Sequence, residues 1–293
     1  MEPRLIEIAQ DMSGFSQFIG SWLCRGNENI VVDVGPSRSV ERLVKSITDL
    51  GIHRVDFVLL THIHIDHAGG LAAFLEHFPM ARAVCHIKGI RHLVEPSKLW
   101  KGSLDTLGDI ARDYGPIAPV HEEKLIPHTE ARVKGLEIIE TPGHAAHHLS
   151  FSYEGNLFAG EACGIYLTIR GSEYLRPATP PVFLMQEFLR SIDRMLAMDD
   201  QPICFAHMGQ AKSSHSLLRR EREQLLRWHE IIKEEISKGG KSPIERCANC
   251  LLATDHELQA FEAMGPEEQG REKFFMANSV KGFLEYLSAH PGG

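Results

Sequence analysis

The chain has 293 residues, which suffices for one large domain or for one domain with an appendage. With 43% hydrophobic and 24% charged residues, its composition is that of an ordinary folded protein rather than a fibrous or disordered one. The formal net charge of −8 argues against a phosphate-neutralising surface, so nucleic acid is not the expected ligand.

The sequence shows no apolar stretch long enough to span a bilayer and no secretory signal, so no membrane partner is expected. The six cysteines are scattered and predict no disulfide framework, which makes a reducing, cytoplasmic location the simplest expectation. Histidine is the outlier of the composition, with 17 residues.

The first two-thirds of the chain alternate between short β-branched runs, which predict buried strands, and amphipathic segments, which predict helices. Helices are predicted at residues 39–50, which Gly51 ends, and at residues 71–78, which Pro79 ends. Strands are predicted at residues 29–35, 55–60, 81–86, 136–140, 149–153, 156–159 and 202–206.

The character of the sequence changes near Ala211, after which helical patterns dominate. Ser213 and Ser214 fit as N-caps of a long helix that ends before Gly239. Further helices are predicted to begin near Pro243 and at Pro266. We therefore divide the chain into a catalytic domain, residues 1–211, and a helical C-terminal region, residues 212–293.

The strongest chemical signal is the segment Thr61-His62-Ile63-His64-Ile65-Asp66-His67, which follows a predicted strand. The carboxyl end of a strand is where α/β sheets commonly place ligands. His62 and His64 can direct both imidazoles onto one metal ion, while Asp66 and His67 can hold a second. A single histidine in such a loop would more often be structural, but three histidines and an aspartate within six residues favour a metal site.

Three further candidate ligands also follow predicted strands. His144 comes after a Pro-Gly turn and is the natural third ligand of the first metal, and His148 beside it is interpreted as a supporting residue. Glu161 could bridge two cations, and His207 would complete the second metal. Taken alone, Glu161 is better explained as an acid at a helix N-terminus and His207 as a structural histidine, and only the pattern as a whole favours the metal site.

The order Asp33, His62-x-His64-x-Asp66-His67, Thr141-Pro142-Gly143-His144, Glu161, His207 resembles the metallo-β-lactamase superfamily over about residues 30 to 210. The sequence looks closer to glyoxalase II and the quorum-signal lactonases than to true β-lactamases, and residues 86–100 and 176–181 resemble an uncharacterised prokaryotic branch. The resemblance implies an α/β (α+β) fold, a four-layer αβ/βα sandwich, with the helical C-terminal appendage following it. It also implies that the metals lie at one edge between two sheets and that Asp33 supports them.

The sequence departs from the family pattern at two positions. The family usually has aspartate where this chain has Glu161, and the extra methylene could alter the metal spacing or leave the carboxylate on one ion. The tyrosine that lactonases have three residues after the bridging acid is replaced by Gly164. Separately, Cys247-Ala248-Asn249-Cys250 lacks a second cysteine pair, so we interpret it as two thiols one helical turn apart.

The sequence therefore predicts a hydrolase with two divalent metal ions, Zn²⁺ first, with iron or manganese as alternatives. A hydroxide activated by the metals would attack a thioester, lactone, carboxylic ester or phosphodiester, with Asp66 as the catalytic residue that orients it. Two alternatives stay open: an iron oxidoreductase of the same fold, and a binding protein with little turnover.

The predicted partner is a small-molecule substrate, and a homodimer formed through the C-terminal region is left open. We expect the pocket walls to come from residues 88–110, residues 164–182 and the C-terminal helices. Trp100, Tyr166 and Tyr174 are the candidate lining side chains, although no substrate-binding residue is assigned.

Overall fold

The computed structural model describes residues 2–290, which form two large β-sheets and a separate hairpin. The first sheet has the strand order β1 (Arg4–Glu7), β2 (Gly20–Cys24), β3 (Ile30–Val32), β4 (Phe57–Leu59), β5 (Arg82–Cys85), β6 (Leu125–Pro127). The second has the order β13 (Gln210–Ala211), β12 (Ile203–Phe205), β9 (Asn156–Gly160), β8 (Leu149–Tyr153), β7 (Glu137–Glu140). The hairpin pairs β10 (Ile165–Ile169) with β11 (Ser172–Arg176).

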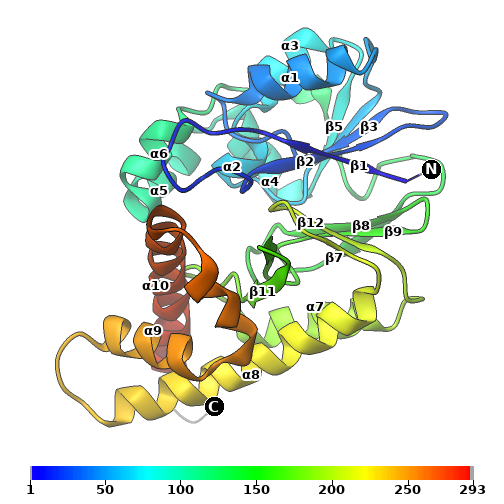
Figure 1. Ribbon diagram of the computed structural model, residues 1–293. Coiled ribbons are helices and arrows are strands. Elements are labelled where there is room, and N and C mark those ends of the chain that lie inside the picture. Colours follow the sequence, from blue (N-terminus) through cyan, green and yellow to red (C-terminus); the bar gives the residue numbers. More distant parts are fainter. Residues whose placement is uncertain (1, 291–293) are drawn as a thin grey trace.

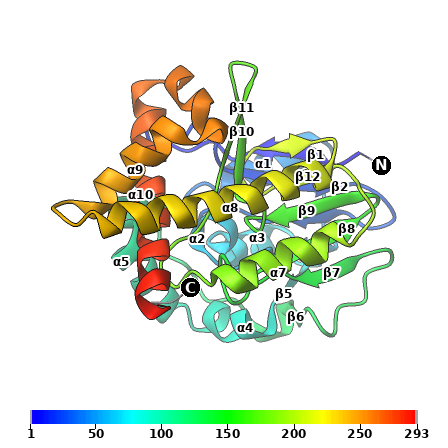
Figure 2. The same ribbon diagram turned by 90° about the horizontal axis from the view of Figure 1, so that it is seen from below.

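The two sheets pack face to face, and helices cover both outer faces (Figure 1). Helices α1 (Val40–Asp49) and α3 (Leu71–His77) lie on the first sheet, and α7 (Met185–Leu196) and α8 (Ser214–Ser237) lie on the second (Figures 1 and 2). The apolar stripe of α1 is buried because its spacing turns every such side chain to one face. The order helix, sheet, sheet, helix confirms the predicted four-layer sandwich.

A hydrophobic core between the sheets joins the two halves of the sandwich. Trp22 and Leu59 of the first sheet and Phe151 and Phe158 of the second belong to one buried cluster. The indole N–H of Trp22 also donates to the carbonyl of Phe205, at 2.7 Å. This bond is buried and crosses between the sheets, so it fixes their relative position close to the end of β12.

Parallel pairing brings the polar strand ends to one edge of the sandwich. Strands β3, β4, β5 and β6 run parallel in the first sheet, as do β9 and β12 in the second. The residues that follow parallel strands therefore leave the sheets at a shared edge. Asp33 follows β3, Thr61 comes soon after β4, Glu161 follows β9 and His207 comes soon after β12.

The remaining helices lie around this edge and below the second sheet (Figure 1). The long helix α8 has the predicted N-cap, since the Ser213 hydroxyl accepts from the N–H of Ser216 at 3.1 Å. The shorter and C-terminal elements are α2 (Ile65–Ala68), α4 (Ile87–Val94), α5 (Ser97–Leu107), α6 (Asp109–Tyr114), α9 (Pro243–Thr254), α10 (Pro266–Ala289) and the 3₁₀ helices η1 (Glu122–Lys124) and η2 (His256–Ala263).

The C-terminal helices share a hydrophobic core with the sheets. Phe283 of α10 packs against Phe183 with ring centroids 4.9 Å apart, and Phe275 stacks on Phe18 at 5.6 Å. Trp228 of α8 is fully buried in the same cluster. The division of the chain at residue 211 stays a prediction.

Helix α10 crosses the segment after β11 at very short range, which gives a test of this packing. A Cβ at Gly282 would lie 2.1 Å from the carbonyl oxygen of Thr179, whereas a Cβ at Gly270 of the same helix would meet nothing within 4 Å. Gly282→Ala should therefore lower the free energy of unfolding by roughly 1–3 kcal/mol, because backbone must move apart.

The matched variant Gly270→Ala should instead raise that free energy by roughly 0.5–1 kcal/mol, since alanine favours the helix. Urea unfolding curves of both variants measure the difference. Equal stability of Gly282→Ala and the wild type would contradict the close approach of α10 to this segment.

Candidate metal centre

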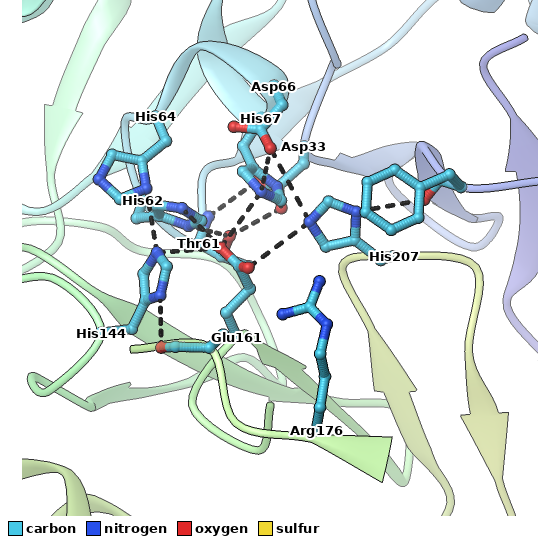
Figure 3. Close-up of polar contacts among 12 residues, drawn as sticks. Asp33, Thr61, His62, His64, Asp66, His67, His144, Glu161, Arg176 and His207 are labelled. Carbon is cyan, nitrogen blue, oxygen red and sulfur yellow. Dashed lines mark hydrogen bonds and ion pairs between the residues drawn. The ribbon is translucent and has the colours of Figure 1, made fainter. Parts of the chain in front are cut away.

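The predicted ligands converge at the shared edge of the two sheets (Figure 3). They form two groups, each with its ligand atoms within 4.8 Å of one another. The first group is His62, His64, His144 and Glu161, and the second is Asp66, His67 and His207. The structure thus brings all seven predicted ligands together, in the two sets that the sequence pattern indicated.

Glu161 lies between the two groups. Its Oε2 is 2.9 Å from Nε2 of His144 and 3.2 Å from Nε2 of His62. Its Oε1 is 3.6 Å from Nε2 of His207. The residue sits in a turn after β9, so the alternative of a helix N-terminal acid is wrong. A glutamate at this position therefore faces both groups despite its extra methylene.

Hydrogen bonds at Nδ1 orient the imidazoles of the second group. The carboxylate that accepts one of these bonds, Asp33, is itself held by further hydrogen bonds. The carboxylate of Asp33 accepts from the backbone N–H and the hydroxyl of Thr61, at 2.8 and 2.7 Å. It also accepts from Nδ1 of His67 at 3.1 Å. Nδ1 of His207 donates to the carbonyl of Phe18 at 3.2 Å.

The first group is oriented in the same way. Nδ1 of His62 lies 3.1 Å from the hydroxyl of Thr61, and Nδ1 of His144 donates to the carbonyl of Ala178 at 2.9 Å. Carbonyls and carboxylates only accept, and the Thr61 hydroxyl already donates to Asp33, so these rings carry a hydrogen on Nδ1 and direct Nε2 toward the centre. His64 is the exception, since its Nδ1 lies 3.0 Å from Nε2 of His144. The Nε2 atoms of His62 and His67 are buried without a hydrogen-bond partner among residues 2–290. The site therefore presents unpaired nitrogen lone pairs toward its centre.

The electrostatics of the centre follow from burial and from this crowding. Burial and the neighbouring histidines hold the pKa values of His62 and His64 well below the usual range. Burial also lowers the pKa of His67, but Asp66, Asp33 and Glu161 outweigh it, so that pKa lies well above normal. Imidazoles and carboxylates are the donors that zinc, iron or manganese prefer, and a bound cation would displace the proton of His67. The residues present therefore fit two divalent cations.

His148 supports Glu161 from beneath. Its Nε2 accepts from the backbone N–H of Glu161 at 3.0 Å, and its Nδ1 lies 2.8 Å from the hydroxyl of Thr141. The ring fills the space that a side chain at Gly160 would need, since a Cβ there would lie 2.4 Å from Nε2. Both ring nitrogens are thus used in hydrogen bonds, and His148 holds the backbone at Glu161 in place as a supporting residue rather than as a ligand.

A cavity of about 430 Å³ opens onto the centre. Its walls come from residues 98–107, residues 176–184 and α10, which agrees with the segments predicted from the sequence. The prediction that Trp100, Tyr166 and Tyr174 line it is wrong. Tyr166 stacks on Phe205 and donates its hydroxyl to Glu173, because β10 turns this side chain away from the cavity. Tyr174 is fully buried, and Trp100 packs against the core.

Sequence reasoning missed one charged residue of this cavity. Arg176 ends β11, is only 3% exposed, and lines the cavity wall. No motif marks it, because an arginine at a strand end is common. Its partner Glu272 lies 96 positions away, so no local sequence pattern could indicate their pairing.

A third group of metal-type side chains lies outside the centre and is arranged differently. His86 and His128 stack with ring centroids 4.5 Å apart, and both Nε2 atoms face Glu140. Their Nδ1 atoms accept backbone N–H groups, from Lys88 and Ile87. The ring hydrogens therefore sit on Nε2 and point at the carboxylate, which makes the group a hydrogen-bonded clamp rather than a cation site.

The cysteine pair of the C-terminal region belongs to no group of three or more metal-type side chains in the described part of the chain. Cys247 and Cys250 lie one turn apart on α9, and both are free thiols. Burial and the Glu235 carboxylate raise the pKa of each thiol, which disfavours reactive thiolates. The contacts agree with the interpretation of two packed thiols.

The fold and the ligand arrangement define a metallo-β-lactamase-type protein. The family model described as metallo-beta-lactamase superfamily matches residues 19–207, and the chain belongs to this superfamily. Among residues 2–290, no helix is both long and apolar enough to cross a membrane.

Similar proteins agree with this assignment. A metallo-β-lactamase fold-containing protein of Sulfurisphaera tokodaii is 28% identical over 222 residues, covering 71% of this chain and 78% of that protein. A hydroxyacylglutathione hydrolase of Erwinia tasmaniensis is 29% identical over 258 residues, covering 84% and 86% of the two chains. The crystal structure of an archaeal superfamily protein from Sulfolobus tokodaii matches with a TM-score of 0.67 at 22% identity, covering 97% and 98% of the two chains.

The support that Asp33 provides leads to a prediction about metal affinity. Asp33→Ala removes the acceptor that fixes the His67 ring, so metal affinity should fall about 10–100-fold. Competition with a chromophoric chelator measures the affinity. Asp49→Ala, an exposed carboxylate paired only with Lys45, serves as the control and should leave the affinity unchanged. Equal affinities of the two variants would contradict the supporting role.

Proposed function

We propose that this protein is a hydrolase that depends on two divalent metal ions and cleaves an ester-type bond of a small molecule. The observation that carries the proposal is the position of Glu161, whose carboxylate lies within 3.6 Å of histidines from both groups. Relatives named hydroxyacylglutathione hydrolase favour a thioester among the ester-type bonds, because acylation of the glutathione thiol forms that bond.

Each ligand has a defined part in this proposal. His62, His64 and His144 would hold one cation, Asp66, His67 and His207 would hold the other, and Glu161 could serve both. Divalent cations bound there supply Lewis acidity toward the substrate carbonyl and lower the pKa of water to about 7.

Asp66 has a second part, because it is the ligand that lines the cavity with a partly exposed carboxylate. Its Oδ2 faces the second group of histidines, 3.6 Å from Nε2 of His67 and 3.9 Å from Nε2 of His207. Oδ1 is then left to accept a proton of the attacking water and to orient it toward the carbonyl. The apolar walls of the cavity hold the rest of the substrate and keep bulk water away.

The test combines metal analysis with turnover. We expect the purified protein to contain two equivalents of metal and to hydrolyse a thioester in a panel that also holds a lactone, a carboxylic ester and a phosphodiester. Asp66→Asn should lower kcat by roughly 10²–10⁴-fold, because it removes the proton acceptor. Asp49→Asn is the matched surface control.

Two results would contradict the proposal. Two bound iron ions with oxygen reduction and no hydrolysis would support the oxidoreductase alternative. Full metal loading without turnover, together with activity in Glu161→Asp, would support a binding protein that has lost catalysis through its longer carboxylate.

A further inference from the structure

We propose that the cavity selects substrates with a carboxylate close to the bond that is cleaved, and that Arg176 binds this carboxylate. The identity of the cleaved bond rests on the proposed function. The expected charge of the ligand rests only on the residues that line the cavity. Figure 3 shows the guanidinium of Arg176 pointing from β11 toward Glu161 and His207, beside the centre.

The guanidinium of Arg176 is held in place but only partly used. Its Nε donates to Glu272 at 2.5 Å, and its Cζ lies 5.5 Å from the ring centre of Phe275. Nη1 makes only a long contact of 3.5 Å with the carbonyl of Pro177. Nη2 has no hydrogen-bond acceptor among residues 2–290. The two terminal nitrogens therefore form an open fork, the geometry that binds a carboxylate with two hydrogen bonds.

The charges around Arg176 leave it incompletely neutralised. Glu272 is fully buried and is shared, because Nε of Arg271 also donates to it, at 2.9 Å. Glu221, another buried acid near Arg176, has its pKa raised to about 8, first by burial and then by Asp255 and Glu257. It is therefore protonated at neutral pH. One carboxylate thus serves two guanidinium groups, and an anion from the cavity would supply the missing charge.

Glu161 attracts Arg176 electrostatically, but no ion pair or hydrogen bond joins these two side chains among residues 2–290. All the ion pairs that it makes in the structure join it to histidines, and these are His62, His67, His144 and His207. In the metal-loaded protein its charge is directed at the two cations. A negatively charged ligand in the cavity is therefore needed to neutralise the positive charge of Arg176.

The rest of the cavity limits the substrate further. Apart from the centre itself, its walls are mainly apolar, with Phe18, Leu107, Ile165 and Leu184 among them. Lys98 also borders the cavity but is exposed to solvent, where a charge contributes little. The geometry therefore fits a small apolar ester or thioester that carries a carboxylate within a few atoms of the reacting carbonyl.

The test measures binding, so that it does not depend on turnover. Zinc-loaded protein is titrated calorimetrically with malonate, succinate and glutarate, and with propanoate, butanoate and pentanoate as monocarboxylates of matched length. The cations take one carboxylate, and only a dicarboxylate can also reach Arg176. We expect one dicarboxylate to bind about 10–100-fold more tightly than its partner, the range for a charge-assisted hydrogen-bond pair.

Variants assign this preference to one residue. Arg176→Gln should reduce it to less than twofold, and Arg176→Lys should retain part of it, because lysine keeps the charge without the fork. Arg176→Lys also keeps the test valid if loss of the buried charge prevents folding. Lys101→Gln, an exposed cation on α5 outside the cavity, is the matched control and should leave the preference unchanged.

Three outcomes would overturn the inference. The first is an unchanged preference in Arg176→Gln, and the second is loss of the preference in Lys98→Gln instead. The third is reduced zinc content in Arg176→Gln with the preference intact in the loaded fraction, which would make Arg176 a support of the centre. Absence of hydrolysis would refute the proposed function alone, whereas hydrolysis without a dicarboxylate preference would refute only this inference.

Discussion

The placement of one buried carboxylate between two sets of imidazoles is the constraint on which the rest of this structure depends. Glu161 is fixed by the end of β9 and by the bond from its N–H to His148. The histidines around it come from loops that are far apart in sequence, and each would repel the others if charged. Burial and the neighbouring rings hold the pKa values of His62 and His64 well below the usual range, so these two rings stay neutral and, with the two acids, suit bound cations.

The hydrogen-bond partners of each histidine ring decide whether that ring can bind a metal ion. At the centre, carbonyls, Asp33 and a hydroxyl pair with Nδ1 of four histidines, His62, His67, His144 and His207, so that Nε2 of these rings faces the site of a cation. His64 differs, since its Nδ1 lies 3.0 Å from Nε2 of His144. In the clamp of His86 and His128, backbone N–H groups occupy Nδ1, and Nε2 carries a hydrogen toward Glu140. The same residue types therefore bind metal in one place and a carboxylate in the other.

Much of the fold could be predicted from local patterns, and the failures have physical causes. The amphipathic helices α1 and α8 and the β-branched strands β3 and β4 lie where their periodicity predicts. Strand β2 was missed because it is buried along its whole length and shows no alternation. Helix α5 was missed because none of its residues is fully buried, so its apolar stripe is weak. Such elements take their structure from neighbours rather than from local preference.

The sequence by itself determined the family, the strand-end positions of the ligands and their division into two sets. Dense spacing in His62-x-His64-x-Asp66-His67 carries that information locally. Only the tertiary structure decided that Glu161 faces both sets and that Arg176 enters the cavity on the support of Glu272. The contact of Arg176 with Glu272 joins residues 96 positions apart, and those of Glu161 depend on one methylene of reach. Their geometry is set by how sheets and helices pack, which no local pattern encodes.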